Sequence, residues 1–136
     1  MTLAADSSVS VPALVGDHED HDLAEAALAR ADVTIAHTVA ETYSVLTRLP
    51  PPRRLDGTAA AALIDSRLAA RWITLDPDAY ARALLRLAAH GVTGGAAYDG
   101  LIALTAAEHD AELVTLDRRA TRTYRRLGVR FTLLGR

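Results

Sequence analysis

The apolar residues of this chain fall into short runs that alternate with longer stretches of helical periodicity. The runs have the length of buried strands, and the longer stretches place apolar residues three and four positions apart, as one helix face requires. Alternating strands and helices are typical of an α/β domain with a mostly parallel central sheet. The expected strands are Leu3–Asp6, Val33–Ala36, Trp72–Leu75, Glu112–Leu116 and Val129–Leu133.

Capping and breaking residues predict the helices between these strands. Asp76, Pro77 and Asp78 form a helix start, with a cap, a proline in the first helical position and an acidic first turn. Pro12 is compatible with its helix only in the first turn, and Trp72 is expected in the core. The predicted helices run from Ser7 or Ser8 to Gly16, Asp22–Ala31, Val39–Arg48, from Asp56 or Thr58 to Ala70, from Asp76 to Gly91, Tyr98–His109 and Arg118–Leu127.

The length and composition predict one ordinary domain over residues 1–136. Half of the 136 residues are apolar, which is enough to bury a core. No run approaches the length of a membrane helix, and the N-terminus lacks the basic and then apolar layout of a secretory signal. We therefore expect a soluble cytoplasmic protein without a membrane partner.

The charged residues exclude several classes of protein. The chain has no cysteine, so a metal would be held by oxygen or imidazole. All 15 basic residues are arginine, which excludes Schiff-base enzymes and Walker-type phosphate loops, because both need a lysine. With a net charge of -2, RNA binding would need a local arginine patch. Arg118, Arg122 and Arg125 form a candidate patch on one helix face, and a merely solvated face is the alternative.

Three aspartates occupy positions that suggest a site. Asp6 and Asp117 each follow a predicted strand directly, and ligands of open parallel sheets bind at the carboxyl ends of strands. The alternative is that each caps the next helix. Asp99 follows a Gly-Gly loop and lies in line with the apolar face of its helix, where an acid indicates either a dipole contact or a site.

Glu41 leaves two interpretations open. Thr38 to Glu41 has the spacing of a capping box, in which the glutamate bonds back to a backbone amide. If the fold instead gathers Glu41 with the three aspartates, the crowded carboxylates would repel one another, and a divalent cation such as Mg²⁺ or Mn²⁺ is the usual compensation.

The segments around these acids resemble one protein family. Leu3 to Ser8, Glu41 early in its helix, Gly94 to Ala103 and Leu113 to Asp117 are similar to the PIN-domain ribonucleases, and more narrowly to the VapC toxins. The resemblance implies a three-layer α/β/α sandwich and an Mg²⁺- or Mn²⁺-dependent endoribonuclease that cuts structured RNA such as tRNA or rRNA. It also implies inhibition by a cognate VapB antitoxin and a homodimer.

The same resemblance assigns roles to residues. Asp6, Glu41, Asp99 and Asp117 match the family's catalytic, metal-binding acids, and Ser8 and Thr115 match its supporting hydroxyl positions. The chain departs from the family at Gly100, where alanine is more usual, and at Arg119, where many members have a further acid.

Two further interpretations stay open. The alternative function is a non-catalytic module of the same fold that binds RNA or a protein. Tyr98 is a candidate for stacking on an unpaired base, whereas the His18 to His21 segment is expected to be a solvated helix entry.

Overall fold

Short parallel strands form the centre of the structure, a computed structural model that describes residues 1–135. The strands are β1 (Thr2–Ala5), β2 (Thr34–Ile35), β3 (Trp72–Ile73), β4 (Ala111–Thr115) and β5 (Phe131–Leu133). β4 lies between β1 and β5, β2 pairs with β3, and a bridge from Ala4 to Val33 joins the two groups. The strand order is thus β3-β2-β1-β4-β5. Every pairing is parallel, which confirms the predicted mostly parallel sheet.

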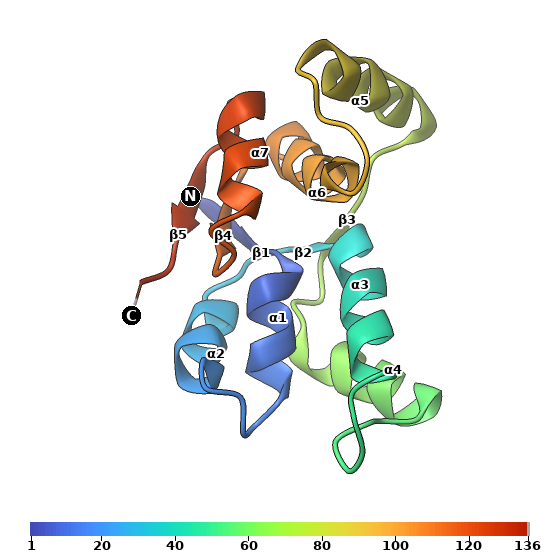
Figure 1. Ribbon diagram of the computed structural model, residues 1–136, viewed down its shortest axis with the longest axis vertical. Helices are drawn as coiled ribbons and strands as arrows, with labels where there is room; N and C mark the ends of the chain where they lie inside the picture. Colours follow the sequence, from blue (N-terminus) through green and yellow to red (C-terminus); the bar gives the residue numbers. More distant parts are fainter. Residues whose placement is uncertain (136) are drawn as a thin grey trace.

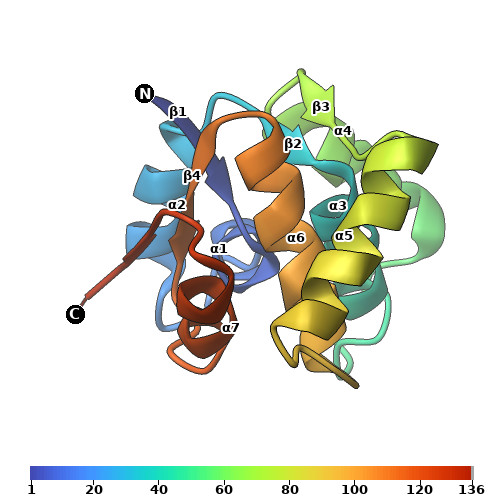
Figure 2. The ribbon, with the colours of Figure 1, turned by 90° about the horizontal axis from the view of Figure 1, so that it is seen from above.

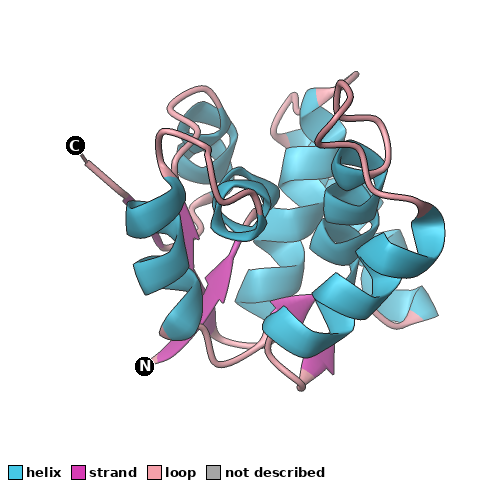
Figure 3. Ribbon diagram, turned by 90° about the horizontal axis from the view of Figure 1, so that it is seen from below, coloured by secondary structure: helices cyan, strands magenta, loops and turns pink. Residues whose placement is uncertain are grey.

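Helices cover both faces of these strands (Figure 1). They are α1 (Ser7–Leu14), α2 (His21–Ala29), α3 (Ala36–Leu46), α4 (Gly57–Arg67), α5 (Pro77–Ala89), α6 (Ala96–Glu108) and α7 (Ala120–Leu127). In Figure 1, α1, α2 and α4 lie on one side of the strands, and α5, α6 and α7 lie on the other. Figure 2 shows α6 between α7 and α5, and Figure 3 shows how short the strands are beside the helices. This is the expected three-layer α/β/α arrangement.

The core lies on both faces of the sheet. Ile102 and Ala103 of α6 are fully buried against Leu113 of β4. Val9 and Ala13 of α1 are fully buried on the opposite face. The predicted apolar face of α6 is therefore buried, but so is every residue from Gly100 to Ala106, and Asp99 directly precedes this buried segment. Within residues 1–135, none of the helices combines the length and the apolar character that a membrane span requires.

The structure corrects several predictions from the sequence. Pro12 is buried in the last turn of α1, not in the first, where it removes only one backbone hydrogen bond near the helix end. Trp72 is 49% exposed and not in the core. It lies on β3 at the sheet edge, where the alternation of the strand turns Ile73 inward and Trp72 outward. The entry to α2 is not wholly solvated, because Asp20 is buried.

Candidate active site

Two of the candidate acids follow the central strands of the sheet. Asp6 comes directly after β1, and Asp117 follows β4. The strand order reverses at this pair, because β2 lies on one side of β1 and β4 on the other. In open parallel sheets, the carboxyl ends of the strands at such a switch point form the usual ligand site.

Asp6 is buried in a network of hydrogen bonds. Its side chain is 3% exposed. Oδ1 accepts hydrogen bonds from the Ser8 amide, at 3.1 Å, and from the Ser8 hydroxyl, and Oδ2 accepts one from the Tyr124 hydroxyl at 2.7 Å. Burial raises the pKa of Asp6, while the hydrogen bonds from Ser8, Thr115 and Tyr124 oppose that rise. Asp6 also caps α1, so the capping interpretation is confirmed and neither Ser7 nor Ser8 is the cap.

Tyr124 offers a direct measurement of how strongly this network holds Asp6. We expect Tyr124→Phe to lower the free energy of unfolding by about 1–3 kcal/mol, because the buried carboxylate loses one donor while the ring stays packed. Urea unfolding of the metal-free protein at neutral pH is the measurement. Tyr80→Phe removes the same hydroxyl from an exposed side chain of α5 and should change little. Equal effects of the two variants would contradict the prediction.

Ser8 and Thr115 join the ends of β1 and β4. The Ser8 hydroxyl accepts a hydrogen bond from the Leu116 amide at 2.8 Å and lies 3.2 Å from the Thr115 hydroxyl. The Thr115 hydroxyl in turn accepts a hydrogen bond from the Asp117 amide at 3.0 Å. These two hydroxyls therefore fix the backbone that carries Asp6 and Asp117.

Asp117 accepts hydrogen bonds from the turn that leads into α7. Its Oδ1 accepts hydrogen bonds from the Arg119 amide at 2.9 Å and the Ala120 amide at 3.3 Å. α7 begins at Ala120 and not at the predicted Arg118, because Arg118 and Arg119 form a turn before the helix. The hydrogen bonds expected of a capping aspartate are therefore present at this turn, whereas Arg119, the N-cap residue of α7, makes no capping bond with its side chain. Both hydrogen bonds use Oδ1, so Oδ2 of Asp117 remains able to bind a ligand.

Glu41 does not form the predicted capping box. α3 begins at Ala36, straight after β2, so Thr38 is already inside the helix, and no side chain caps Ile35. Oε1 of Glu41 instead accepts a hydrogen bond from the Ser7 hydroxyl at 2.9 Å, and Oε2 lies 3.5 Å from Nε2 of His37. Ser7 thus draws the Glu41 carboxylate toward the beginning of α1.

Asp99 shows that the four acids share one electrostatic environment. Its pKa is raised to about 6, first by partial burial and then by the negative charges of Asp117, Glu41 and Asp6. Helices α3 and α6 and strands β1 and β4 therefore bring the four predicted acids close enough to interact.

The donor set fits a hydrated divalent cation. Three carboxylates raise the pKa of the fourth, Asp99, so the group has an excess of negative charge that a cation would neutralise. Among residues 1–135, no three acidic or histidine side chains lie in an arrangement that encloses a metal ion directly. Mg²⁺ does not require such an enclosure, because it keeps several water ligands and often binds through one or two carboxylates.

His37 is a residue near the site that sequence reasoning missed. Its ring stacks on Tyr98, with the ring centroids 5.6 Å apart and the planes at 5° to each other. The available signal was the spacing of four residues between His37 and Glu41, which places both on one face of α3.

The predicted arginine face lies on α7 and the turn before it. Arg118 and Arg122 are exposed. Arg125 has its guanidinium 5.4 Å from the centre of the Phe131 ring and donates a hydrogen bond to Thr121. Arg125 is therefore partly engaged in packing, whereas the other two present their charges to solvent.

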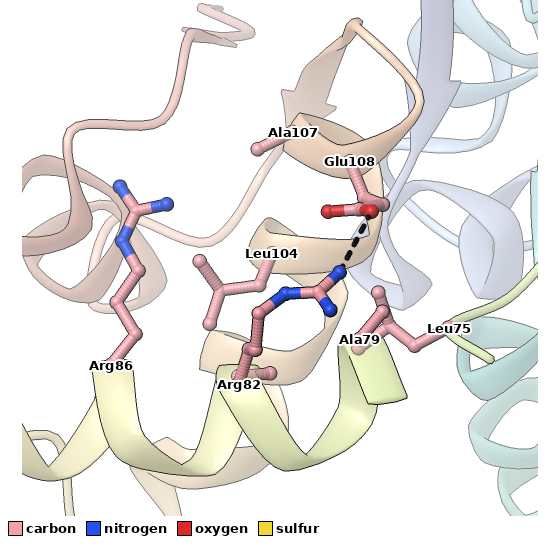
Figure 4. Close-up of a pocket in the computed structure, with 8 residues that line it drawn as sticks. Leu75, Ala79, Arg82, Arg86, Leu104, Ala107 and Glu108 are labelled. Carbon is pink, nitrogen blue, oxygen red and sulfur yellow. Dashed lines mark hydrogen bonds and ion pairs between the residues drawn. The ribbon is translucent and has the colours of Figure 1, made fainter. Parts of the chain in front are cut away.

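A groove between α5 and α6 lies away from these acids (Figure 4). Its volume is about 310 Å³, and an ion pair between Arg82 and Glu108 crosses it at 3.4 Å. None of the four candidate acids lines it. The groove is therefore separate from the candidate site.

Comparisons with known proteins agree with this architecture. The sequence profile of the PIN domain matches residues 4–126. The chain is 44% identical to ribonuclease VapC40 of Mycobacterium tuberculosis over 132 residues, which cover 97% of this chain and 98% of the relative.

Solved structures show the same fold at lower identity. The crystal structure of M. tuberculosis VapC20, described as a sarcin-ricin loop cleaving toxin, matches with a TM-score of 0.69 and 19% identity, covering 89% of this chain and 94% of that one. VapBC2 from Rickettsia felis, bound to a promoter DNA fragment, matches with a TM-score of 0.67 and 16% identity, covering 99% and 100%. At such identities the likeness concerns the fold alone.

Proposed function

Because this chain belongs to the PIN-domain family, we propose that it is an endoribonuclease toxin that hydrolyses phosphodiester bonds of structured RNA, such as tRNA or rRNA, with Mg²⁺ or Mn²⁺. The observation that carries this proposal is the group of four acids that share one electrostatic environment at the switch point of the sheet. The similarity to a named ribonuclease over nearly the whole chain supports the same reaction. The proposal treats residues 1–136 as one PIN domain.

In this proposal the four acids have unequal surroundings. One or two of the Asp99, Glu41 and Asp117 carboxylates would hold the hydrated cation directly, while Asp6, fixed by Ser8 and Tyr124, contributes its charge from the buried side. A divalent cation in this position supplies a Lewis acid that favours ionisation of water and offsets the negative charge that builds up on the phosphate. Ser8 and Thr115 keep the acids in place, and no side chain acts as a covalent nucleophile.

The proposed partners follow from charge and from the relatives. Arg118 and Arg122, with a weaker part for Arg125, would contact RNA phosphates, for which guanidinium groups are well shaped. A VapB antitoxin would neutralise the toxin by placing a basic side chain near the acids, because a crowded acidic site attracts such a group. VapC-type relatives and VapBC assemblies of the same fold support this partner. We also propose that the protein forms a homodimer. Its proposed location is the cytoplasm, where the RNA substrates are.

Cleavage of total RNA by the purified protein tests the proposal. We expect cleavage with Mg²⁺ or Mn²⁺ and its loss in EDTA. Glu41→Gln should lower the rate about 10- to 100-fold, because glutamine keeps an acceptor for Ser7 but removes the negative charge. Glu108→Gln, at the far end of α6, is the matched control and should act like the parent protein.

Two results would contradict the proposal. Cleavage that continues in EDTA would exclude the metal-dependent reaction. A protein that binds RNA but cuts none under any of these conditions would support the alternative, a non-catalytic module with the same fold.

A further inference from the structure

A groove begins beside the candidate acid Glu41 and extends along α3. Its volume is about 410 Å³. The residues that line it are Ser7, His37, Ala40, Glu41, Ser44, Val45, Arg48 and Tyr98. Ser7 and Glu41 also belong to the surroundings of the acid cluster, so the groove opens directly beside the candidate active site.

Two aromatic rings form one wall of this groove. Tyr98 precedes Asp99 in the first turn of α6 and is 56% exposed. His37 lies one turn before Glu41 on α3. The plane of its ring is nearly parallel to that of the Tyr98 ring, at an interplanar angle of 5°. The stacked histidine limits the freedom of an otherwise exposed tyrosine ring. The pair therefore presents a preorganised π surface next to two of the candidate acids.

A cation lies at the other end of the groove. Arg48 lies in the turn that follows α3, beyond the C-cap Thr47, and lines the groove at the end of the helix opposite to His37. Within residues 1–135, the Arg48 guanidinium has neither an ion pair nor a hydrogen bond to another side chain. Between the two ends, Ser44 is exposed and provides a hydroxyl group.

We propose that this groove binds one nucleotide of unpaired RNA next to the bond that is cut, with the base stacked on Tyr98 and a neighbouring phosphate on Arg48. The inference rests on the proposed ribonuclease function. Base stacking on aromatic rings tolerates any base, so the groove would position a single-stranded segment without selecting its sequence.

The lining of the groove favours a nucleotide over a segment of protein. Ala40 and Val45 are its only aliphatic residues, whereas a docked amphipathic helix requires a continuous apolar stripe. The aromatic pair, the hydroxyl groups and the distal guanidinium instead match the base, sugar and phosphate of one nucleotide.

A binding experiment that needs no cleavage tests this proposal. The probe is a short unpaired RNA that contains 2-aminopurine, whose fluorescence falls when it stacks, and EDTA prevents metal-dependent cleavage. We expect the parent protein and Tyr98→Phe to quench the probe. Tyr98→Ala should lose the quenching and bind about tenfold more weakly. Tyr80→Ala, which removes a similarly exposed tyrosine from α5, is the matched control and should bind like the parent protein.

Arg48 makes a separate contribution to the same experiment. Arg48→Gln should weaken binding, while quenching at saturation remains. The slope of log affinity against log salt concentration should fall by about the amount expected for one lost phosphate contact. Arg30→Gln, an exposed arginine at the end of α2, is its control.

The outcomes separate this proposal from the proposed function. Unchanged quenching and affinity in Tyr98→Ala would overturn the nucleotide site. If Tyr98→Ala weakened binding to a protein inhibitor while RNA binding stayed unchanged, the groove would be a protein-binding site. That result would also overturn the proposed nucleotide site. A protein that quenches the probe normally but cuts no RNA would leave the groove standing and refute the nuclease.

Discussion

Asp99→Asn is expected to stabilise the metal-free protein, to destabilise it relative to the parent in Mn²⁺, and to lower RNA cleavage by about a hundredfold or more. Partial burial and the charges of Asp117, Glu41 and Asp6 raise the pKa of Asp99 to about 6. Above that pH, Asp99 is ionised in the folded protein, although its ionisation costs more free energy there than in the unfolded chain. Asparagine has no charge and removes this cost.

The pH dependence of the metal-free stability follows from the same shift. The folded state binds the Asp99 proton more tightly than the unfolded state, whose pKa is near 3.8. The unfavourable contribution of Asp99 is therefore complete above about pH 6, declines as the pH falls from 6 toward 4, and disappears below that. The advantage of Asp99→Asn should be about 1–2 kcal/mol at pH 7, after allowance for solvent screening, and close to zero at pH 4.

Mn²⁺ should reverse the order of the two proteins. A cation that binds only the folded state stabilises it by mass action, by about 2.7 kcal/mol at a hundred times its dissociation constant. If Asp99 holds the cation as proposed, the variant lacks one of its carboxylates and should gain much less. Thermal unfolding in EDTA and in Mn²⁺ measures both effects. Asp65→Asn, an exposed change on α4, is the control for removal of a charge and should follow the parent protein in both solutions. An Asp99→Asn protein that gains as much from Mn²⁺ as the parent would exclude Asp99 as a ligand.

The positions of the strands and of most helices were predictable because local patterns determine them. Asp76 caps α5 with a hydrogen bond from the Ala79 amide at 2.8 Å, and Pro77 occupies the first helical position, as the sequence predicts. The spacing along α6 likewise predicted burial of Ile102 and Ala103, although the whole segment from Gly100 to Ala106 is buried. These features depend on neighbours within a few residues, which a single sequence contains.

The surroundings of the acids were not predictable because distant residues create them. Tyr124 reaches Asp6 across 118 positions of the chain, and Ser7 reaches Glu41 across 34. The capping box at Glu41 fails because β2 runs directly into α3, which places Thr38 inside the helix. Spacing indicated Asp6 and Asp117 as strand-end residues. Only the fold shows that their charges, together with that of Glu41, raise the pKa of Asp99.

Two adjacent serines at the beginning of α1 provide a matched pair for the second prediction. Ser8 donates to Asp6, accepts from the Leu116 amide at 2.8 Å and lies 3.2 Å from the Thr115 hydroxyl. Ser7 makes one side-chain hydrogen bond, to Glu41 at 2.9 Å. Both are partly buried hydroxyls in the first turn of the same helix. They differ mainly in what they hold together.

Ser8→Ala should therefore lower the free energy of unfolding by about 2–4 kcal/mol, because it leaves a partly buried amide without its acceptor and a buried carboxylate with one donor fewer. Ser7→Ala should cost about 1 kcal/mol or less, because Glu41 is near the surface. Its main effect should be on cleavage, since the Glu41 carboxylate loses the contact that orients it toward the other acids. Urea unfolding and RNA cleavage, measured on both variants, separate the two roles. If Ser7→Ala destabilised the protein as much as Ser8→Ala, the junction between β1 and β4 would not depend on Ser8 in the way that its hydrogen bonds indicate.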